Sequence, residues 1–157
     1  MNVFVDSGVF IEYLKGRKTD FYELLISLEY NLFINQVVFS EFLYYFIGIV
    51  GNKSPMTLKE SCRIADCFKD RNPTDMLPGV QVLNHNSDIS QSAIDIIKRF
   101  NLLPNDALIL ATCKHFEIEY LASFDSDFEV PCNALGIHIF NDKVGLKDFM
   151  HSKKLAP

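Results

Sequence analysis

Short apolar runs alternate with longer amphipathic segments along the chain. The short runs predict buried strands at residues 2–5, 31–34, 80–83, 120–123 and 137–140. Between them, apolar positions recur at helical spacing and predict helices at residues 9–14, 21–28, 37–49, 57–68, 87–100 and 106–116. Because strands that alternate with helices need crossover connections, this order predicts an α/β fold. We expect a three-layer α/β/α sandwich around a mainly parallel sheet of four to five strands.

The length and the absence of linkers predict one domain. The chain has 157 residues, and neither an internal repeat nor a linker divides it. We expect a single domain over residues 1–150, followed by a tail over residues 151–157 that frays. The longest apolar stretch, residues 37–50, contains Ser40, Glu41 and Gly48 and is shorter than a membrane span of roughly 18 residues. No membrane association is therefore expected.

Composition and charge narrow the possible functions. Apolar residues make up 48% of the chain and charged residues 22%, which is typical of globular proteins and excludes a disordered chain. The formal net charge is −5, so the bulk charge does not attract nucleic acid. A site for a polyanion would need a divalent cation or a local basic patch. Lys15, Arg17 and Lys18 are candidates for such a patch, although an ordinary solvated turn also explains them.

The cysteines and the first residues indicate the compartment. The four cysteines form neither a CxxC pair nor a cluster with zinc-ligand spacing. The opening residues MNVFVDSG lack the basic and apolar regions of a signal peptide. We therefore expect a cytoplasmic protein with reduced thiols.

Acidic residues follow two of the predicted strands. Asp6 comes directly after the first strand, and Asp125 and Asp127 follow the fourth. In open parallel sheets, ligands bind beyond the carboxyl ends of the strands, where the strand order reverses. If the second and third strands lie on one side of the first strand and the fourth on the other, Asp6 and Asp125 face one crevice. Each also has a structural explanation, Asp6 as a helix N-cap and Asp125 or Asp127 as a turn residue.

Two further acids lie near the starts of apolar helices. Glu41 is surrounded by apolar helical neighbours, where an ionised carboxylate is costly unless it is paired or binds a metal. Alternatively, Glu41 points to solvent from the first turn of its helix. Asp106 is the only charged residue between Arg99 and Lys114. The alternative here is that Asn105 caps the helix and Asp106 is a favourable acid in its first turn.

The four acids together indicate a metal site. Carboxylates about 4 Å apart repel one another by roughly 4 kcal/mol per pair at a surface-like dielectric. A cluster of Asp6, Glu41, Asp106 and Asp125 would therefore need a cation or strongly raised pKa values. Mg²⁺ or Mn²⁺ suits such oxygen ligands, and it would turn an acidic pocket into a phosphate site. It would also activate water against a phosphodiester.

The four acids lie in the segments VFVDSGVFIEYL, SEFLYY, LPNDALILATC and LASFDSDF. Together these segments resemble the motifs of the PIN domain family, the metal-dependent nuclease domain of VapC-type toxins. The resemblance runs from Met1 to about Phe140. It implies a compact α/β/α fold and an endoribonuclease that uses one or two Mg²⁺ or Mn²⁺ ions to hydrolyse single-stranded RNA.

The resemblance also implies a role for each acid. Asp6 and Asp106 would be the principal metal ligands, and Glu41 a ligand or an orienting group. Asp125 would complete the set, directly or through water. Asp127 lies in the same turn and is the alternative fourth acid, but its position in the motif favours Asp125. Supporting groups that orient a carboxylate or a phosphate would be Ser7 and Ser123.

Partners follow from the same resemblance. Family members usually form homodimers, and an antitoxin occupies the crevice of the toxins, so we expect single-stranded RNA, an antitoxin protein and a second copy of the chain as partners. The toxin of a toxin–antitoxin pair is the first hypothesis. The alternatives are a housekeeping RNA-processing nuclease and a binding or scaffold module that keeps the PIN fold without catalysis.

The sequence contains neither a nucleotide-binding motif nor an evident base-stacking surface. The chain has no GxGxxG, and GIVGNKS lacks the ending of a phosphate loop and follows a helix, so no nucleotide cofactor is expected. The aromatic residues Tyr44, Tyr45 and Phe46 are expected in the core or at an interface. A base-stacking surface would need exposed rings in a basic groove.

Overall fold

A five-stranded parallel sheet forms the centre of the protein. The computed structural model describes residues 1–154, with side chains described through residue 152. The strand order is β3-β2-β1-β4-β5, and every neighbouring pair is parallel. The strands are β1 (Asn2–Val5), β2 (Asn31–Asn35), β3 (Gln81–Leu83), β4 (Tyr120–Ala122) and β5 (His138–Phe140). The predicted sheet and the predicted placing of the strands on either side of β1 are confirmed.

The strand β1 lies in the middle of the sheet and forms its most buried part. Val3, Phe4 and Val5 are all 0% exposed. A strand that has neighbours on both edges and helices on both faces has no side for polar residues, which explains its continuous apolar sequence. The strand order reverses between β1 and β4, so the polar residues that follow these two strands lie next to each other at the edge of the sheet.

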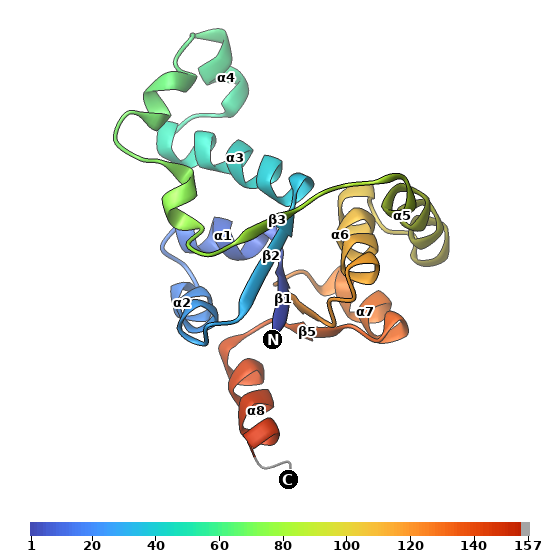
Figure 1. Cartoon of the computed structure of the whole chain (residues 1–157). Coiled ribbons are helices and arrows are strands. Elements are labelled where there is room, and N and C mark those ends of the chain that lie inside the picture. Colours follow the sequence, from blue (N-terminus) through green and yellow to red (C-terminus); the bar gives the residue numbers. More distant parts are fainter. Residues whose placement is uncertain (155–157) are drawn as a thin grey trace.

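Helices cover both faces of the sheet and give the predicted three layers. Figure 1 shows α1 and α2 on one side of the sheet and α6 and α7 on the other, with α5 outside α6. The α-helices are α1 (Ser7–Leu14), α2 (Thr19–Ser27), α3 (Gln36–Gly51), α4 (Pro55–Glu60), α5 (Ser87–Phe100), α6 (Pro104–His115), α7 (Glu129–Leu135) and α8 (Lys143–Lys154). Short 3₁₀ helices are η1 (Ile64–Phe68), η2 (Pro73–Met76) and η3 (Ser126–Phe128).

Helix α3 connects the two sides because it packs against both α1 and α6. The Asn35 side chain caps it by accepting a hydrogen bond of 3.0 Å from the backbone N–H of Val38. The same side chain donates a 3.1 Å hydrogen bond to the Thr112 hydroxyl on α6. Asn35 is only 4% exposed, so this buried amide fixes the start of α3 relative to α6.

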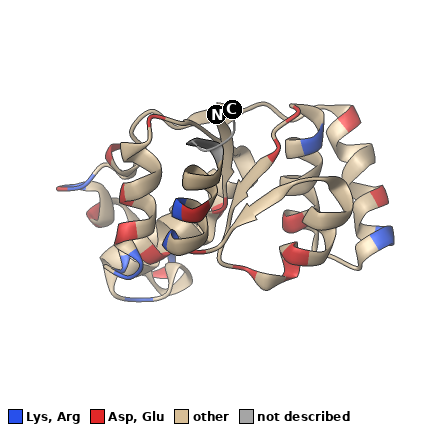
Figure 2. Cartoon of the chain, turned by 90° about the horizontal axis from the view of Figure 1, so that it is seen from below, with Lys and Arg blue, Asp and Glu red and all other residues tan. Residues whose placement is uncertain are grey.

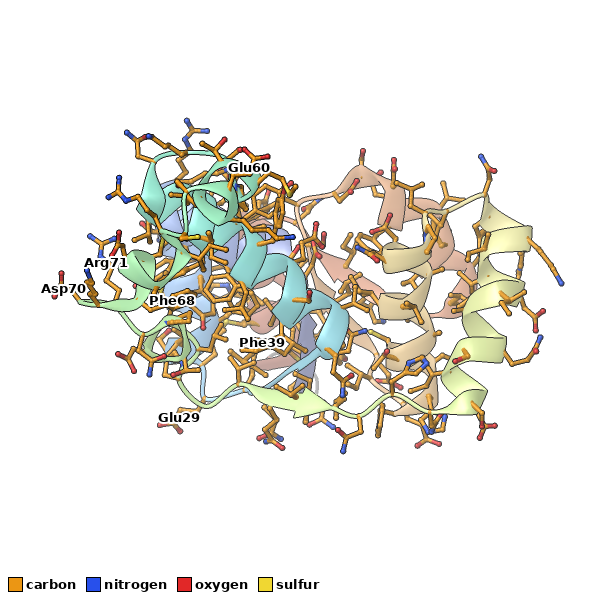
Figure 3. The ribbon with its side chains drawn as sticks, turned by 90° about the horizontal axis from the view of Figure 1, so that it is seen from above. Glu29, Phe39, Glu60, Phe68, Asp70 and Arg71 are labelled. Atoms are coloured by element: carbon orange, nitrogen blue, oxygen red, sulfur yellow. The ribbon has the colours of Figure 1, made fainter. Side chains whose placement is uncertain are left out.

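The segment after α3 differs from the prediction. A single helix over residues 57–68 is wrong, because the chain leaves the helical conformation at Cys62, where φ is +55°. The helix α4 precedes this break and η1 follows it, and both pack against α3. Farther along, Asp70 and Arg71 project outward at the periphery (Figure 3). Amphipathic spacing persists through the break, which is why the pattern suggested one helix.

Two C-terminal helices were not predicted. Helix α7 is short and contains Pro131, which weakens its sequence signal. Helix α8 covers one end of the molecule through Leu146, which is fully buried. It continues through Lys154, so residues 151–154 of the expected tail are helical, and their fraying stays a prediction; residues 155–157 lie outside the described part. Among residues 1–154, no helix has both the length and the apolar character needed to cross a membrane.

Candidate active site

The four predicted acids line one cavity at the carboxyl edge of the sheet. Asp6 and Asp125 follow the adjacent strands β1 and β4, Glu41 lies on α3, and Asp106 lies at the start of α6. The cavity has a volume of about 530 Å³. Asp127 lies in the same turn as Asp125 but is not among the described residues that line the cavity.

Asp6 is the most buried of these acids, with 8% of its surface exposed. It occupies the N-cap position of α1, as the capping explanation predicts, but its side chain makes no capping hydrogen bond. Its two oxygens instead accept hydrogen bonds from hydroxyl groups, Oδ2 from Ser123 at 2.8 Å and Oδ1 from Ser7 at 3.4 Å. Burial raises the pKa of Asp6, while the Ser123 hydrogen bond lowers it and the Glu41 charge raises it again.

Ser123 connects Asp6 to the turn that carries Asp125. Its hydroxyl is fully buried, donates to Asp6 and accepts a 3.1 Å hydrogen bond from the backbone N–H of Asp125. Asp125 in turn accepts a 2.9 Å hydrogen bond from the backbone N–H of Asp127 through Oδ1. The turn explanation is therefore correct for Asp125, and the same side chain also lines the cavity. Ser7, the other hydroxyl donor to Asp6, is the first residue of α1 and lines the cavity too.

The pKa of Asp106 reflects the burial and the negative charge of the site. It lies in the first turn of α6, whose N-cap is Leu103 with Pro104 directly after it, so the expected capping by Asn105 is wrong. The pKa of Asp106 is raised from 3.8 to about 6, first by burial and then by the charges of surrounding carboxylates. Those carboxylates belong to Asp125, Asp6, Glu41 and Asp127. These carboxylates are thus close enough to Asp106 to disfavour its charged form.

Glu41 faces this cluster from α3. Because α3 begins at Gln36, Glu41 lies in the second turn, and the expected first-turn position is wrong. Its side chain is partly buried and lines the cavity, and its charge raises the pKa of both Asp6 and Asp106. Val38 and Phe42 on the same helix are fully buried in the core, whereas Glu41 lies on the side of α3 that lines the cavity.

The donor set fits a hard divalent ion that shares its shell with a phosphate. All four acids offer carboxylate oxygens, which Mg²⁺ and Mn²⁺ prefer. Gly8 leaves room beside them, because a Cβ at this position would lie 3.2 Å from Oδ2 of Asp6. Within residues 1–154, no three His, Cys, Asp or Glu side chains are close enough to enclose an ion. Mg²⁺ usually keeps several waters and takes one or two carboxylates plus substrate phosphates, so it does not require such a cage.

Sequence reasoning missed two aromatic side chains at this cavity, Tyr45 and Phe124, and gave too little weight to two basic ones. Lys15, Lys18 and Tyr45 line it together with the acids. Tyr44 and Tyr45 are 51% and 42% exposed, so they lie outside the core of this chain and their expected place at an interface stays a prediction; Phe46 is buried as expected. Helical spacing held the signal, because Tyr45 lies four residues after Glu41 and therefore on the same face of α3.

Comparison with known proteins decides the family. The family model of the PIN domain matches residues 3–133. This chain belongs to the PIN domain family. Ribonuclease VapC2 of Methanocaldococcus jannaschii is 35% identical to it over 130 residues, which cover 81% of this chain and 87% of that protein. Ribonuclease VapC6 of the same organism is 34% identical over 139 residues, covering 82% and 91%.

A solved structure agrees with this assignment of the fold. A toxin–antitoxin complex from Klebsiella pneumoniae contains a chain that superposes on this PIN domain with a TM-score of 0.57. The match covers 83% of this PIN domain and 93% of the other chain, at 18% sequence identity. The predicted family and its α/β/α fold are therefore confirmed.

Proposed function

We propose that this PIN-domain protein is a Mg²⁺- or Mn²⁺-dependent endoribonuclease that hydrolyses single-stranded RNA and acts as the toxin of a toxin–antitoxin pair. The observation that carries the proposal is the cavity lined by Asp6, Glu41, Asp106 and Asp125, in which the pKa of Asp106 is raised to about 6. Further support comes from relatives named Ribonuclease VapC2 and VapC6 and from the fold shared with a toxin–antitoxin complex.

In this proposal, Asp6 and Asp106 hold the metal ion, and Glu41 and Asp125 complete the site directly or through water. Asp127 is the alternative to Asp125. A bound divalent ion supplies positive charge for the scissile phosphate and lowers the pKa of water at the site. A carboxylate of the cluster would accept the proton of the attacking water; as the new P–O bond forms, the P–O bond to the leaving oxygen breaks and that oxygen takes up a proton from solvent.

The buried hydroxyl groups of Ser123 and Ser7 orient the Asp6 carboxylate for metal binding. Ser123 donates to Asp6 at 2.8 Å and thereby favours its carboxylate form against the cost of burial. The Ser7 hydroxyl lies 3.4 Å from the other oxygen of Asp6. Because Ser123 is fully buried, its hydroxyl cannot turn to solvent, and it fixes one face of the Asp6 carboxylate.

Cleavage of labelled RNA tests the enzymatic part. A mixed-sequence panel of single-stranded RNA is incubated with the protein and Mn²⁺, with and without a chelator. We expect cleavage that the chelator stops and that Asp106→Asn reduces at least 100-fold, the order expected when a metal ligand or an electrostatic group of the site is lost. Asp95→Asn, an exposed acid on α5, is the matched control and retains activity.

Calorimetry tests metal binding separately from activity. Wild-type protein and Asp95→Asn should bind Mn²⁺ with the same affinity, and Asp106→Asn more weakly. A protein that binds Mn²⁺ but cleaves no RNA in the panel would favour the alternative of a non-catalytic PIN-fold module. A protein that neither binds Mn²⁺ nor cleaves RNA contradicts the proposal altogether.

The toxin role has its own tests. Induced expression in the cytoplasm of a bacterial host should stop the growth of the host. Expression of Asp106→Asn should leave growth normal. A short reading frame beside the gene should encode an antitoxin that binds the protein and blocks cleavage. A homodimer is expected in solution by mass measurement. Cleavage without any effect on growth, and without such a neighbour, would favour the housekeeping RNA-processing nuclease instead.

A further inference from the structure

The cavity mouth carries side chains that the proposed chemistry does not use. Besides the acids, it is lined by Lys15 and Lys18 near the end of α1, Tyr45 on α3, and Phe124 after β4. Acidic positions are spread over helices on both sides of the sheet (Figure 2). A polyanionic substrate therefore needs local attraction at the cavity itself.

Lys18 is the cation best placed to give that attraction. Its ammonium group lies 3.8 Å from the centroid of the Phe124 ring. In the described part of the chain, no carboxylate lies within ion-pair distance of it, whereas Lys15 is bound to Glu12 at 2.9 Å. The ammonium thus forms no ion pair and is supported by an aromatic face, although Glu12, which also lines the cavity, interacts with its charge at longer range.

Tyr45 gives the cavity an exposed aromatic surface. Its side chain is 42% exposed while it lines the cavity, and its neighbour Tyr44 is similarly exposed at 51% but does not line the cavity. The two rings meet edge to face with their centroids 5.8 Å apart, so replacing Tyr44 tests whether an effect belongs to the ring that lines the cavity. An exposed ring beside a phosphate-binding cation is the combination by which proteins bind single-stranded nucleic acid, the ring stacking on a base and the cation meeting the backbone.

We propose that Tyr45 and Lys18 form a nucleotide-binding subsite beside the acids. The Tyr45 ring stacks on an unpaired base next to the cleaved bond, and the Lys18 ammonium binds a neighbouring phosphate. This inference rests on the proposed ribonuclease function and deepens it, because only an unpaired base offers its face to a ring. Both residues position the substrate and take no part in bond cleavage.

Tryptophan fluorescence tests the stacking directly, since the chain contains no Trp. Tyr45→Trp introduces a single reporter at the subsite, and Tyr44→Trp introduces the matched control. Each is titrated with a single-stranded RNA 20-mer and with its duplex, using Ca²⁺ in place of Mn²⁺, and a gel verifies that the RNA stays intact. We expect saturable quenching of Trp at position 45 by the single strand and little by the duplex. Absence of quenching, or equal quenching at both positions, overturns the proposal.

Steady-state kinetics test how much the Tyr45 ring contributes to substrate binding. Tyr45→Ala should raise KM about tenfold with kcat nearly unchanged, the effect of losing one base stack. Tyr45→Phe keeps the ring and should restore wild-type KM, and Tyr44→Ala should behave as wild type. A wild-type KM for Tyr45→Ala contradicts the subsite, as does a change of its oligomeric mass, which would make this ring part of an interface.

Salt dependence tests the phosphate contact. For single strands, each phosphate contact contributes about 0.7 to the slope of log affinity against log salt. Lys18→Gln should reduce the slope by about that amount, and Lys53→Gln, an exposed lysine away from the cavity, should leave it unchanged. An unchanged slope for Lys18→Gln overturns this contact.

The two proposals fail in different ways. If single-stranded RNA quenches Trp at position 45 but no RNA is cleaved with Mn²⁺, the ribonuclease proposal fails and the subsite stands. If RNA is cleaved while Tyr45→Ala and Lys18→Gln keep wild-type KM and salt slope, the ribonuclease proposal stands and the subsite fails.

Discussion

Replacing Asp106 with Asn should stabilise the metal-free protein while removing its metal affinity. The native pKa of Asp106 is about 6, above its ordinary value of 3.8, because of burial and neighbouring carboxylates. The folded state therefore binds the proton more tightly, and the free energy of unfolding falls as the pH rises from about 4 to about 7. Above that window the charged Asp106 destabilises the fold, and Asn removes this cost.

The size of the effect can be worked out from the same values. The interval from 3.8 to about 6 corresponds to roughly 3 kcal/mol at about 1.36 kcal/mol per pH unit. Asp106 is only partly buried, so solvent screening reduces this to about 1.5 kcal/mol. Asn also loses about 0.5 kcal/mol of favourable interaction between the acid and the N-terminus of α6. We therefore expect a net stabilisation of about 1 kcal/mol at pH 8.

Urea unfolding with a chelator at pH 4, 6 and 8 measures this effect. The difference between Asp106→Asn and wild type should be slightly unfavourable or close to zero at pH 4 and rise to about 1 kcal/mol at pH 8. Asp95→Asn should show no such trend. Saturating Mn²⁺ should reverse the order, because binding at 100 times Kd stabilises wild type by about 2.7 kcal/mol and the variant much less. A difference between variant and wild type that does not change with pH would refute the reasoning.

Three further substitutions test how the site is held. Ser123→Ala should weaken Mn²⁺ binding about tenfold in calorimetry, because Asp6 loses its 2.8 Å donor; an unchanged Kd would contradict this. Gly8→Ala should weaken Mn²⁺ binding without loss of stability in thermal unfolding, since its Cβ presses on Asp6 while alanine favours the helix; wild-type affinity would argue against it. Asn35→Ala should cost about 2–3 kcal/mol in urea unfolding and Ser54→Ala, an exposed cap of α4, about 1 kcal/mol; equal losses would show that the buried link to α6 contributes nothing.

Much of the fold could be predicted because it depends on local sequence pattern. The apolar runs of β1 and β4 and the amphipathic pattern of α5 each fix an element through the side chains that must be buried. The break near Cys62 could not be predicted, because the change to positive φ lies within a continuous amphipathic pattern. Helices α7 and α8 were not predicted because they are short or sparsely apolar and depend on packing against the rest of the fold for their stability.

The candidate site also combines features that the sequence predicts with features that it leaves open. The four acids could be named because each occupies a recognisable place in the sequence, after a strand or near the start of a helix. The sequence left open what the Asp6 side chain binds at the N-cap of its helix; in the structure it makes no capping hydrogen bond and accepts one from the Ser123 hydroxyl, 117 residues away. Likewise, the exposure of Tyr45 depends on which face of α3 the sheet and α6 cover.

The sequence by itself therefore determined the strands, most of the helices, the family and the candidate acids, since periodicity and motif spacing act over a few residues. Only the tertiary structure decided which carboxylates share a cavity, why the pKa of Asp106 rises, and which lysine and tyrosine stand beside them. Charge interaction and burial depend on distances between segments far apart in the chain, and the packing of helices on the parallel sheet sets those distances.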